Sequence, residues 1–248
     1  MAKTQLTWYG HSAYKIVTPG GKTLLIDPWI TNPKNPNAEK DLAALTQVDA
    51  IFLTHGHSDH VGETVAIGKK TGAKLVATMD LAVALTKLLG FPPEQATGET
   101  TGFFGGRVPL LNGDVISTLV PALHGGAIAK DDTATPFLAS PASGVIIEVK
   151  NGPCFYDTGD TDVFSDMSLV SRFNKIDVML ACIGDHFTMG PERAALAVKL
   201  VQPKLVIPHH YATFPVLTGT PERFREALKK EGCGAELRVM EVGQTIEL

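Results

Sequence analysis

Strand-like and helix-like segments alternate along this 248-residue chain, and the same plan occurs in both halves. The first half contains strand-like segments at residues 6–9, 13–17, 23–26, 50–53 and 74–78, with helix-like segments at 62–70 and 81–89. The second half contains strand-like segments at residues 115–120, 144–149, 154–157, 178–183 and 205–208, with helices that begin at Pro191 and after Thr220. Each half therefore predicts a mixed sheet with helices over one face.

Two sheets of this kind bury their remaining apolar faces when they pack against each other with the helices outside. The sequence therefore predicts an α/β (α+β) fold, a four-layer αββα sandwich of two mixed β-sheets with helices on the outer faces. No change in composition marks a linker between the halves, and we expect residues 1–248 to form a single domain. The segment at 125–143 has no periodicity, and its length suits either a lid over a site or a disordered excursion.

The composition limits the kinds of protein this chain can be. With 44% hydrophobic and 19% charged residues, it differs from disordered, collagen-like and coiled-coil sequences. Its net charge of -4 is spread without a basic stripe, so we expect no nucleic-acid partner. It has no apolar run of about 20 residues and no signal-like N-terminal stretch, and its three cysteines include no C-x-x-C pair. We expect a soluble, cytoplasmic protein with no membrane partner.

Residues 54–60 hold four potential metal ligands within six positions, directly after the strand at 50–53 and directly before a helix. A turn at the carboxyl end of a strand can direct successive side chains in two directions. His55 and His57 would then face one metal ion, and the carboxylate and imidazole that follow would face a second. Imidazole together with carboxylate suits Zn, Mn or Fe(II).

This segment matches the H-x-H-x-D-H motif of the metallo-β-lactamase fold superfamily at every defined position, and the chain resembles that superfamily. Downstream, His124, Asp160 and His210 occur in the order in which the family supplies its later ligands. Upstream, Asp27 lies in a segment similar to the family's first motif, whose Asp supports the metal-binding loop without binding metal. The resemblance spans nearly the whole chain and implies the four-layer sandwich.

Four further segments look most like a branch of small metal-dependent hydrolases akin to ascorbate-phosphate lactonase. They lie at residues 9–13, 159–161, 186–191 and 210–215. The resemblance implies a centre of two divalent ions, with Zn²⁺ favoured and Mn²⁺ as the alternative. The implied ligands are His55, His57 and His124 for one ion, Asp59, His60 and His210 for the other, and Asp160 between them.

Two pairs of residues compete for a place in this centre. Spacing alone does not choose between Asp157 and Asp160 as the bridge, but Gly159 gives a tight turn before Asp160, and the family's Gly-Asp-Thr pattern matches there. In an extended segment, His209 and His210 point to opposite sides, so only one can bind metal. The resemblance selects His210 and leaves His209 as a packing or supporting residue.

Three residues are assigned to roles beside metal binding. Asp59 and His186 are our candidates for direct participation in the reaction, although loop packing remains an equal alternative for His186. His11 is expected to orient a metal ligand through a hydrogen bond.

The chemistry that the resemblance implies is hydrolysis of an ester, lactone or phosphoester. A hydroxide that bridges two ions supplies the nucleophile, and a net charge of about +1 at the centre favours a small, anionic substrate. The alternative is a dioxygenase-like redox enzyme on the same fold, which is disfavoured because this chain keeps the full dinuclear ligand set. The sequence leaves a homo-oligomer open.

Overall fold

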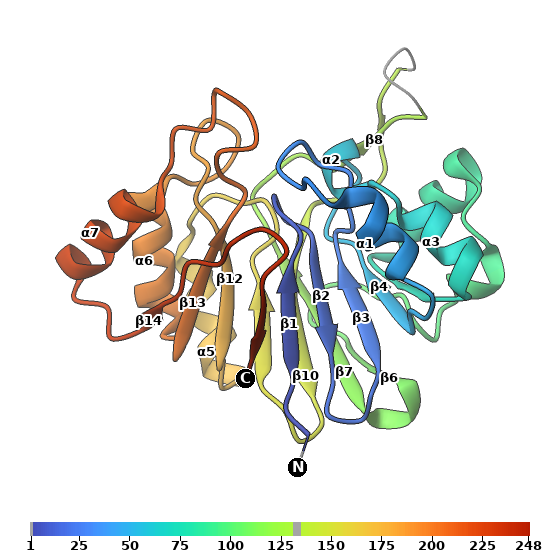
Figure 1. Ribbon diagram of the computed structural model, residues 1–248, viewed down its shortest axis with the longest axis horizontal. Coiled ribbons are helices and arrows are strands. Elements are labelled where there is room, and N and C mark those ends of the chain that lie inside the picture. Colours follow the sequence, from blue (N-terminus) through green and yellow to red (C-terminus); the bar gives the residue numbers. More distant parts are fainter. Residues whose placement is uncertain (1, 131–134) are drawn as a thin grey trace.

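The computed structural model describes residues 2–130 and 135–248 (Figure 1). In this part of the chain, the first sheet has six strands in the order β15-β1-β2-β3-β4-β5. They are β1 (Gln5–Trp8), β2 (Tyr14–Val17), β3 (Thr23–Ile26), β4 (Ala50–Phe52), β5 (Lys74–Val76) and β15 (Thr245–Glu247). The pairs from β15 to β3 are antiparallel, and β3, β4 and β5 run parallel, so the sheet is mixed.

The second sheet has the described strand order β14-β13-β12-β11-β10-β7-β6. Its strands are β6 (Arg107–Leu110), β7 (Val115–Pro121), β10 (Ser143–Val149), β11 (Cys154–Asp157), β12 (Val178–Cys182), β13 (Leu205–His209) and β14 (Glu236–Leu237). The pairs from β6 to β11 are antiparallel and those from β11 to β14 are parallel. Both sheets are therefore mixed, as the sequence predicted.

Helices cover the outer face of each sheet (Figure 1). The α-helices are α1 (Ala38–Ala44), α2 (Ser58–Val61), α3 (Thr64–Thr71), α4 (Met79–Ala84), α5 (Ser168–Phe173), α6 (Pro191–Val201) and α7 (Pro221–Glu231). Short helical turns are η1 (Leu85–Leu89), η2 (Pro93–Gln95), η3 (Leu111–Gly113) and η4 (Ser165–Met167). Helices α1, α3 and α4 flank the first sheet, and α5, α6 and α7 flank the second. The predicted four-layer αββα sandwich is confirmed.

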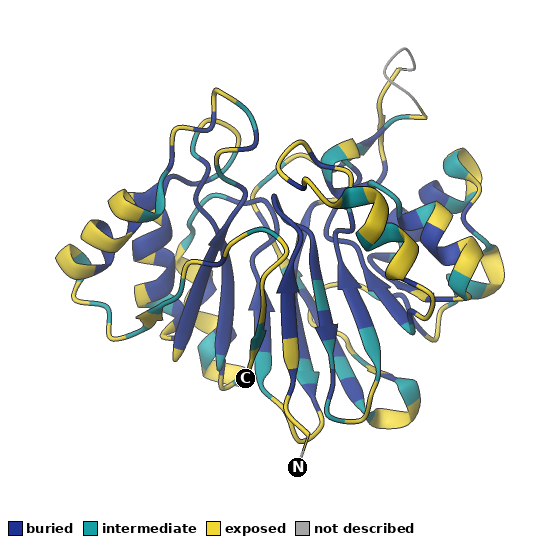
Figure 2. Cartoon of the chain, in the orientation of Figure 1, coloured by how far each residue is buried: buried dark blue, intermediate teal, exposed yellow. Residues whose placement is uncertain are grey.

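The strands are apolar on both faces because both faces are covered (Figure 2). In β3, Leu24 and Ile26 pack between the two sheets, whereas Leu25 packs toward the helices. In β12, Leu180 packs between the sheets and Met179 packs toward α6 and α7. This alternation places one continuous core between the sheets and a further core under each helical layer.

The helix starts that the sequence marked are found where expected. Thr220 caps α7, since its hydroxyl accepts a hydrogen bond from the Arg223 N–H, and the helix ends at Gly232 in the left-handed conformation (φ 68°). α6 begins with Pro191 at its first turn. Helices α6 and α7 have 11 residues each, and no described helix has the length and apolarity needed to cross a membrane.

The segment at 125–143 contains a short hairpin. β8 (Ala127–Ile128) pairs antiparallel with β9 (Phe137–Leu138), and this hairpin stands out from the sandwich at the edge where α2 lies (Figure 1). Residues 131–134 of the segment lie outside the described residues.

Candidate metal centre

The predicted site residues lie on loops and on the short helix α2 at one edge of the sandwich. His11 follows β1, Asp27 follows β3, residues 54–60 follow β4, His124 follows β7, Asp160 follows β11 and His210 follows β13. The carboxyl ends of these strands meet at the same edge, because the strands run in the same direction within each sheet. This is the upper edge in Figure 1, where α2 lies.

Three imidazoles form one group of potential metal ligands. The donor nitrogens of His55, His57 and His124 lie within 4.8 Å of one another. His57 Nδ1 is 3.0 Å from His55 Nε2 and 3.3 Å from His124 Nε2. The turn that carries His55 and His57 passes close to β8, because a Cβ at Gly56 would stand only 2.7 Å from the Ala127 carbonyl oxygen. Glycine is therefore required at this position.

A second group combines three imidazoles with a carboxylate. The donor atoms of His11, Asp59, His60 and His210 lie within 4.8 Å of one another. Asp59 Oδ2 is 3.1 Å from His11 Nε2 and 3.8 Å from His210 Nε2. The 3.1 Å contact gives His11 the position expected of a residue that orients a metal ligand through a hydrogen bond.

Asp160 lies between the two groups. Its Oδ2 is 3.0 Å from His210 Nε2 and 3.3 Å from His60 Nε2, which belong to the second group. The same oxygen is 3.5 Å from His124 Nε2 and 4.0 Å from His55 Nε2, which belong to the first. One carboxylate oxygen therefore faces ligand atoms of both groups.

The chemistry of these donor atoms fits a divalent ion. In the described part of the chain, His60 Nε2, His210 Nε2 and Asp160 Oδ1 are buried without a hydrogen-bond partner. Buried polar atoms are rarely left unpaired in folded proteins. Imidazole nitrogens and carboxylate oxygens directed into one space are the ligand set that Zn²⁺ and related ions prefer.

Burial keeps most of these histidines in the neutral form that binds metal. Desolvation holds the pKa of His55 well below its usual value, and it also lowers the pKa values of His57 and His124. Burial alone would lower the pKa of His60, but Asp160 and Asp27 outweigh it and raise that pKa well above its usual value. The structure thus stabilises positive charge beside Asp160.

Asp27 supports His60 from below the site. Its carboxylate accepts hydrogen bonds from the Thr54 N–H (2.8 Å) and the Thr54 hydroxyl (2.6 Å), and it lies 2.7 Å from His60 Nδ1. Since Nδ1 is occupied in this way, Nε2 is the nitrogen that faces Asp160. Thr54 Oγ1 also lies 3.0 Å from His55 Nδ1, so one threonine supports residues of both groups.

The two competing pairs are separated by the fold. Asp157 is buried below the site, and its carboxylate accepts a hydrogen bond from the Gly159 N–H (2.9 Å) that shapes the turn leading to Asp160. His209 points into the core, where its Nδ1 lies 3.2 Å from the Ser12 hydroxyl. Asp160 lies between the two ligand groups, and His210, which directly follows β13, belongs to the second group.

Left-handed backbone conformations are concentrated at this edge. Asp27 (φ 41°), His11 (φ 50°) and His210 (φ 54°) all adopt them, although none is a glycine. Such conformations cost roughly 1–3 kcal/mol each and persist where the surrounding structure enforces them. At His210 this turn of the backbone directs the side chain away from the course of β13 and toward Asp160.

A cleft of about 240 Å³ opens above Asp160. It is lined by His57, Asp59, His124, Asp160, Phe187 and His210. His186 is exposed and is not among the lining residues, and its ring meets the Phe187 ring edge-on at 4.5 Å between centroids. Phe187 lies in the segment at 186–191 that resembles the hydrolase branch, but nothing in that segment indicated that its side chain would line the cleft.

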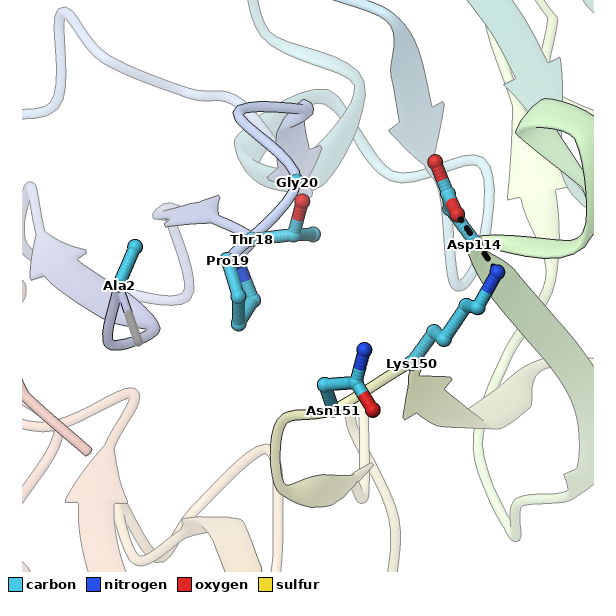
Figure 3. A pocket seen from close by; sticks show the side chains of 7 residues that line it. All are labelled: Ala2, Thr18, Pro19, Gly20, Asp114, Lys150 and Asn151. Carbon is cyan, nitrogen blue, oxygen red and sulfur yellow. Dashed lines mark ion pairs between the residues drawn. The ribbon is translucent and has the colours of Figure 1, made fainter.

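A larger hollow of about 320 Å³ lies at the opposite edge (Figure 3). It is formed by the turn between β2 and β3 and the turn between β10 and β11. An ion pair crosses part of it, with Lys150 Nζ 3.7 Å from Asp114 Oδ1. Its described lining contains no histidine or cysteine, so it lacks the ligands of the upper site.

Comparisons with known proteins identify the family of this chain and match its fold. The sequence profile of the β-lactamase superfamily domain matches residues 22–211. The chain is 49% identical over 246 residues to the "UPF0173 metal-dependent hydrolase" of Thermodesulfovibrio yellowstonii, covering 99% of this chain and 92% of that protein. A protein of the same description from Anaeromyxobacter dehalogenans is 48% identical, covering 98% and 86%. The solved structure of Igni18, a metallo hydrolase from Ignicoccus hospitalis, is 34% identical with a TM-score of 0.85, covering 100% and 99%.

Proposed function

The chain belongs to the UPF0173 metal-dependent hydrolases of the β-lactamase superfamily, and we propose that it uses two divalent ions at one centre to hydrolyse an ester, lactone or phosphoester bond in a small molecule. The observation that carries this proposal is the position of Asp160, whose Oδ2 lies 3.0–4.0 Å from ligand atoms of both groups. A carboxylate so placed suits a bridge between two ions.

Each ion would have its own set of protein ligands. We assign His55, His57 and His124 to the first ion, Asp59, His60 and His210 to the second, and Asp160 to both. The nitrogen and oxygen ligands favour Zn²⁺, with Mn²⁺ as the alternative. Bound there, the ions supply a water activated near neutral pH and polarise a carbonyl or phosphoryl oxygen.

Asp59 is positioned to act on the reacting groups as well as on the second ion. It lines the cleft, and its orientation is fixed by His11, whose Nε2 is 3.1 Å from Asp59 Oδ2 and whose Nδ1 is 2.9 Å from the Thr213 hydroxyl. Burial alone would raise the pKa of Asp59, but its contacts with His11 and His60 outweigh this and keep it ionised. An ionised carboxylate here can bind a cation and accept a hydrogen bond from the attacking water.

We also propose that the enzyme works on a small molecule in the cytoplasm. The cleft volume of about 240 Å³ suits a small substrate. Cys154, Cys182 and Cys233 all lie in the described ranges and are free thiols, which is typical of a reducing compartment.

The proposal is tested by assaying protein stripped of metal and then reloaded with Zn²⁺, Mn²⁺ or Fe²⁺ against phosphomonoesters, phosphodiesters, lactones, carboxylic esters and thioesters, with oxygen consumption measured in parallel. We expect hydrolysis of at least one class that a chelator abolishes and metal restores. Asp114→Asn is the control variant and should leave hydrolysis unchanged, because Asp114 lines the hollow at the opposite edge. Oxygen consumption with bound iron and no hydrolysis would contradict the proposal and favour redox chemistry.

A further inference from the structure

The cleft is lined by one apolar side chain beside its candidate metal ligands. Among the described residues that line it, Phe187 alone is apolar, and 53% of this residue is exposed. An exposed phenyl ring that lines a polar cleft offers apolar surface that a bound molecule can cover, and such burial is favourable. A substrate bound in this cleft would contact the Phe187 ring.

The fold fixes the position of Phe187. The two residues before it, Asp185 (φ 65°) and His186 (φ 56°), adopt left-handed conformations, and the Asp185 carboxylate accepts a hydrogen bond from the His186 N–H (3.0 Å). Two residues after it, the Met189 N–H donates to the Thr161 carbonyl (2.8 Å). Because Thr161 directly follows Asp160, the Phe187 loop is tied to the turn that carries the central carboxylate.

Further apolar side chains stand around the same edge. Leu123 precedes His124 and is 55% exposed, and its backbone N–H donates to the Thr161 hydroxyl (2.9 Å). On the other side, the half-buried rings of Trp29 and Phe214 stack with centroids 6.0 Å apart. Both rings also meet His11, the neighbour of Asp59, edge-on at 5.2 and 5.8 Å.

The next feature is the charge of the residues that line the cleft. No Lys or Arg occurs among the lining residues that the structure describes. Arg193 lies close by, but its guanidinium forms a bidentate pair with Asp162, the residue whose N–H bonds the Leu123 carbonyl. An anionic group away from the scissile bond would therefore find no Lys or Arg among the described lining residues to pair with.

We propose that Phe187 determines substrate specificity, by packing against an uncharged, apolar group attached to the bond that is hydrolysed. This inference rests on the proposed function, because the two ions are what bring the scissile bond next to Phe187. It narrows the substrates to esters, lactones or phosphoesters whose other substituents carry no charge. The positive charge of the centre would then stabilise the negative charge that develops at the scissile group during the reaction, not a charge elsewhere on the substrate.

The inference can be tested through binding, without a known substrate. The probes are n-alkyl hydroxamates from acetohydroxamate to octanohydroxamate, since the hydroxamate group binds the ions and the alkyl chain extends into the cleft. Kd is measured by calorimetry on the Zn²⁺-loaded protein. We expect Kd to fall by roughly two- to fourfold for each added methylene until the chain passes the phenyl ring, as burial of a CH₂ group predicts.

Three variants separate the role of Phe187 from general effects. In Phe187→Ala, Kd for acetohydroxamate and the metal content should stay the same while the dependence on chain length is largely lost, and Phe187→Leu should retain part of it. Phe173→Ala is the matched control: Phe173 is 77% exposed on α5, at the opposite edge from α2 (Figure 1), and its loss should change nothing.

Each result has a defined meaning. Three results would overturn the role of Phe187 and leave the proposed function intact. They are a Kd that does not change with chain length in the native protein, an unchanged dependence of Kd on chain length in Phe187→Ala, and tighter binding of a carboxylate-terminated hydroxamate than of its methyl-terminated counterpart. Failure of acetohydroxamate to bind the metal-loaded protein would overturn the accessible metal centre on which both proposals rest.

Discussion

The carboxylate of Asp27 and the imidazole of His60 lie 2.7 Å apart, both completely buried, at the point where the loop after β3 meets helix α2. The same carboxylate accepts two hydrogen bonds from Thr54. Asp27 thus fixes which nitrogen of His60 faces the site, without being directed into the cleft itself.

We expect Asp27→Asn to lower metal affinity by about 10- to 100-fold, because the amide replaces one of the accepting oxygens that hold His60 and Thr54. Metal affinity is measured by competition with a chromophoric chelator. Asp114→Asn, at the opposite edge, provides the control. Unchanged affinity in Asp27→Asn would show that His60 does not depend on this support.

His57→Ala should lose one metal ion and reduce kcat/KM by more than about 100-fold, the upper range for residues that only support a ligand. The fold should survive, because His57 is half-buried on a loop and the main core lies between the sheets. His60→Ala should be equally inactive. Near-ultraviolet circular dichroism checks the fold in both variants, and near-native turnover in either would remove that residue from the ligand set.

Asp160→Asn should damage the centre far more than Asp157→Asn. An amide nitrogen cannot bind a metal ion as a carboxylate oxygen does, and the two ions would lose a negative charge between them. Asp157 instead supports the turn through the hydrogen bond that it accepts from the Gly159 N–H, and an amide oxygen can accept the same bond. Metal content measured on both variants under identical loading checks the prediction, and the reverse order of damage would place the bridge at Asp157.

The metal-free protein should lose stability as pH falls from about 6.5 to about 4. Burial lowers the folded-state pKa of His11 to about 4 and those of His55 and His209 well below 6.5. In this window the unfolded chain binds more protons than the folded one, so acid favours unfolding. The loss should be at least about 1.4 kcal/mol per pH unit, the value for one fully linked group. Urea unfolding at several pH values measures it, and constant stability would contradict the prediction.

The sequence predicted those elements whose signals are local. The bounds of β3 and β11 agree with the apolar segments at 23–26 and 154–157, because their apolar residues are bounded by turn residues. By contrast, α1 (Ala38–Ala44) has no buried residue and therefore no apolar face to detect. β6 contains Pro109, which is typical of an edge strand and weakens the strand pattern.

The same limit applies to the site. His55, His57, Asp59 and His60 were recognisable because they lie close together in the sequence. The contact of His11 with Thr213 joins residues 202 positions apart, and no sequence pattern marks such a pair. Phe187 lines the cleft because of the shape of its loop, and that shape depends on contacts with other loops that the sequence does not reveal.

The most direct test of the central claim is anomalous diffraction from crystals of the Zn²⁺-loaded protein. Our account predicts two peaks on either side of the Asp160 carboxylate, about 3.5–4 Å apart, one next to His55, His57 and His124 and the other next to Asp59, His60 and His210. A single peak, or two peaks that do not share Asp160, would contradict it.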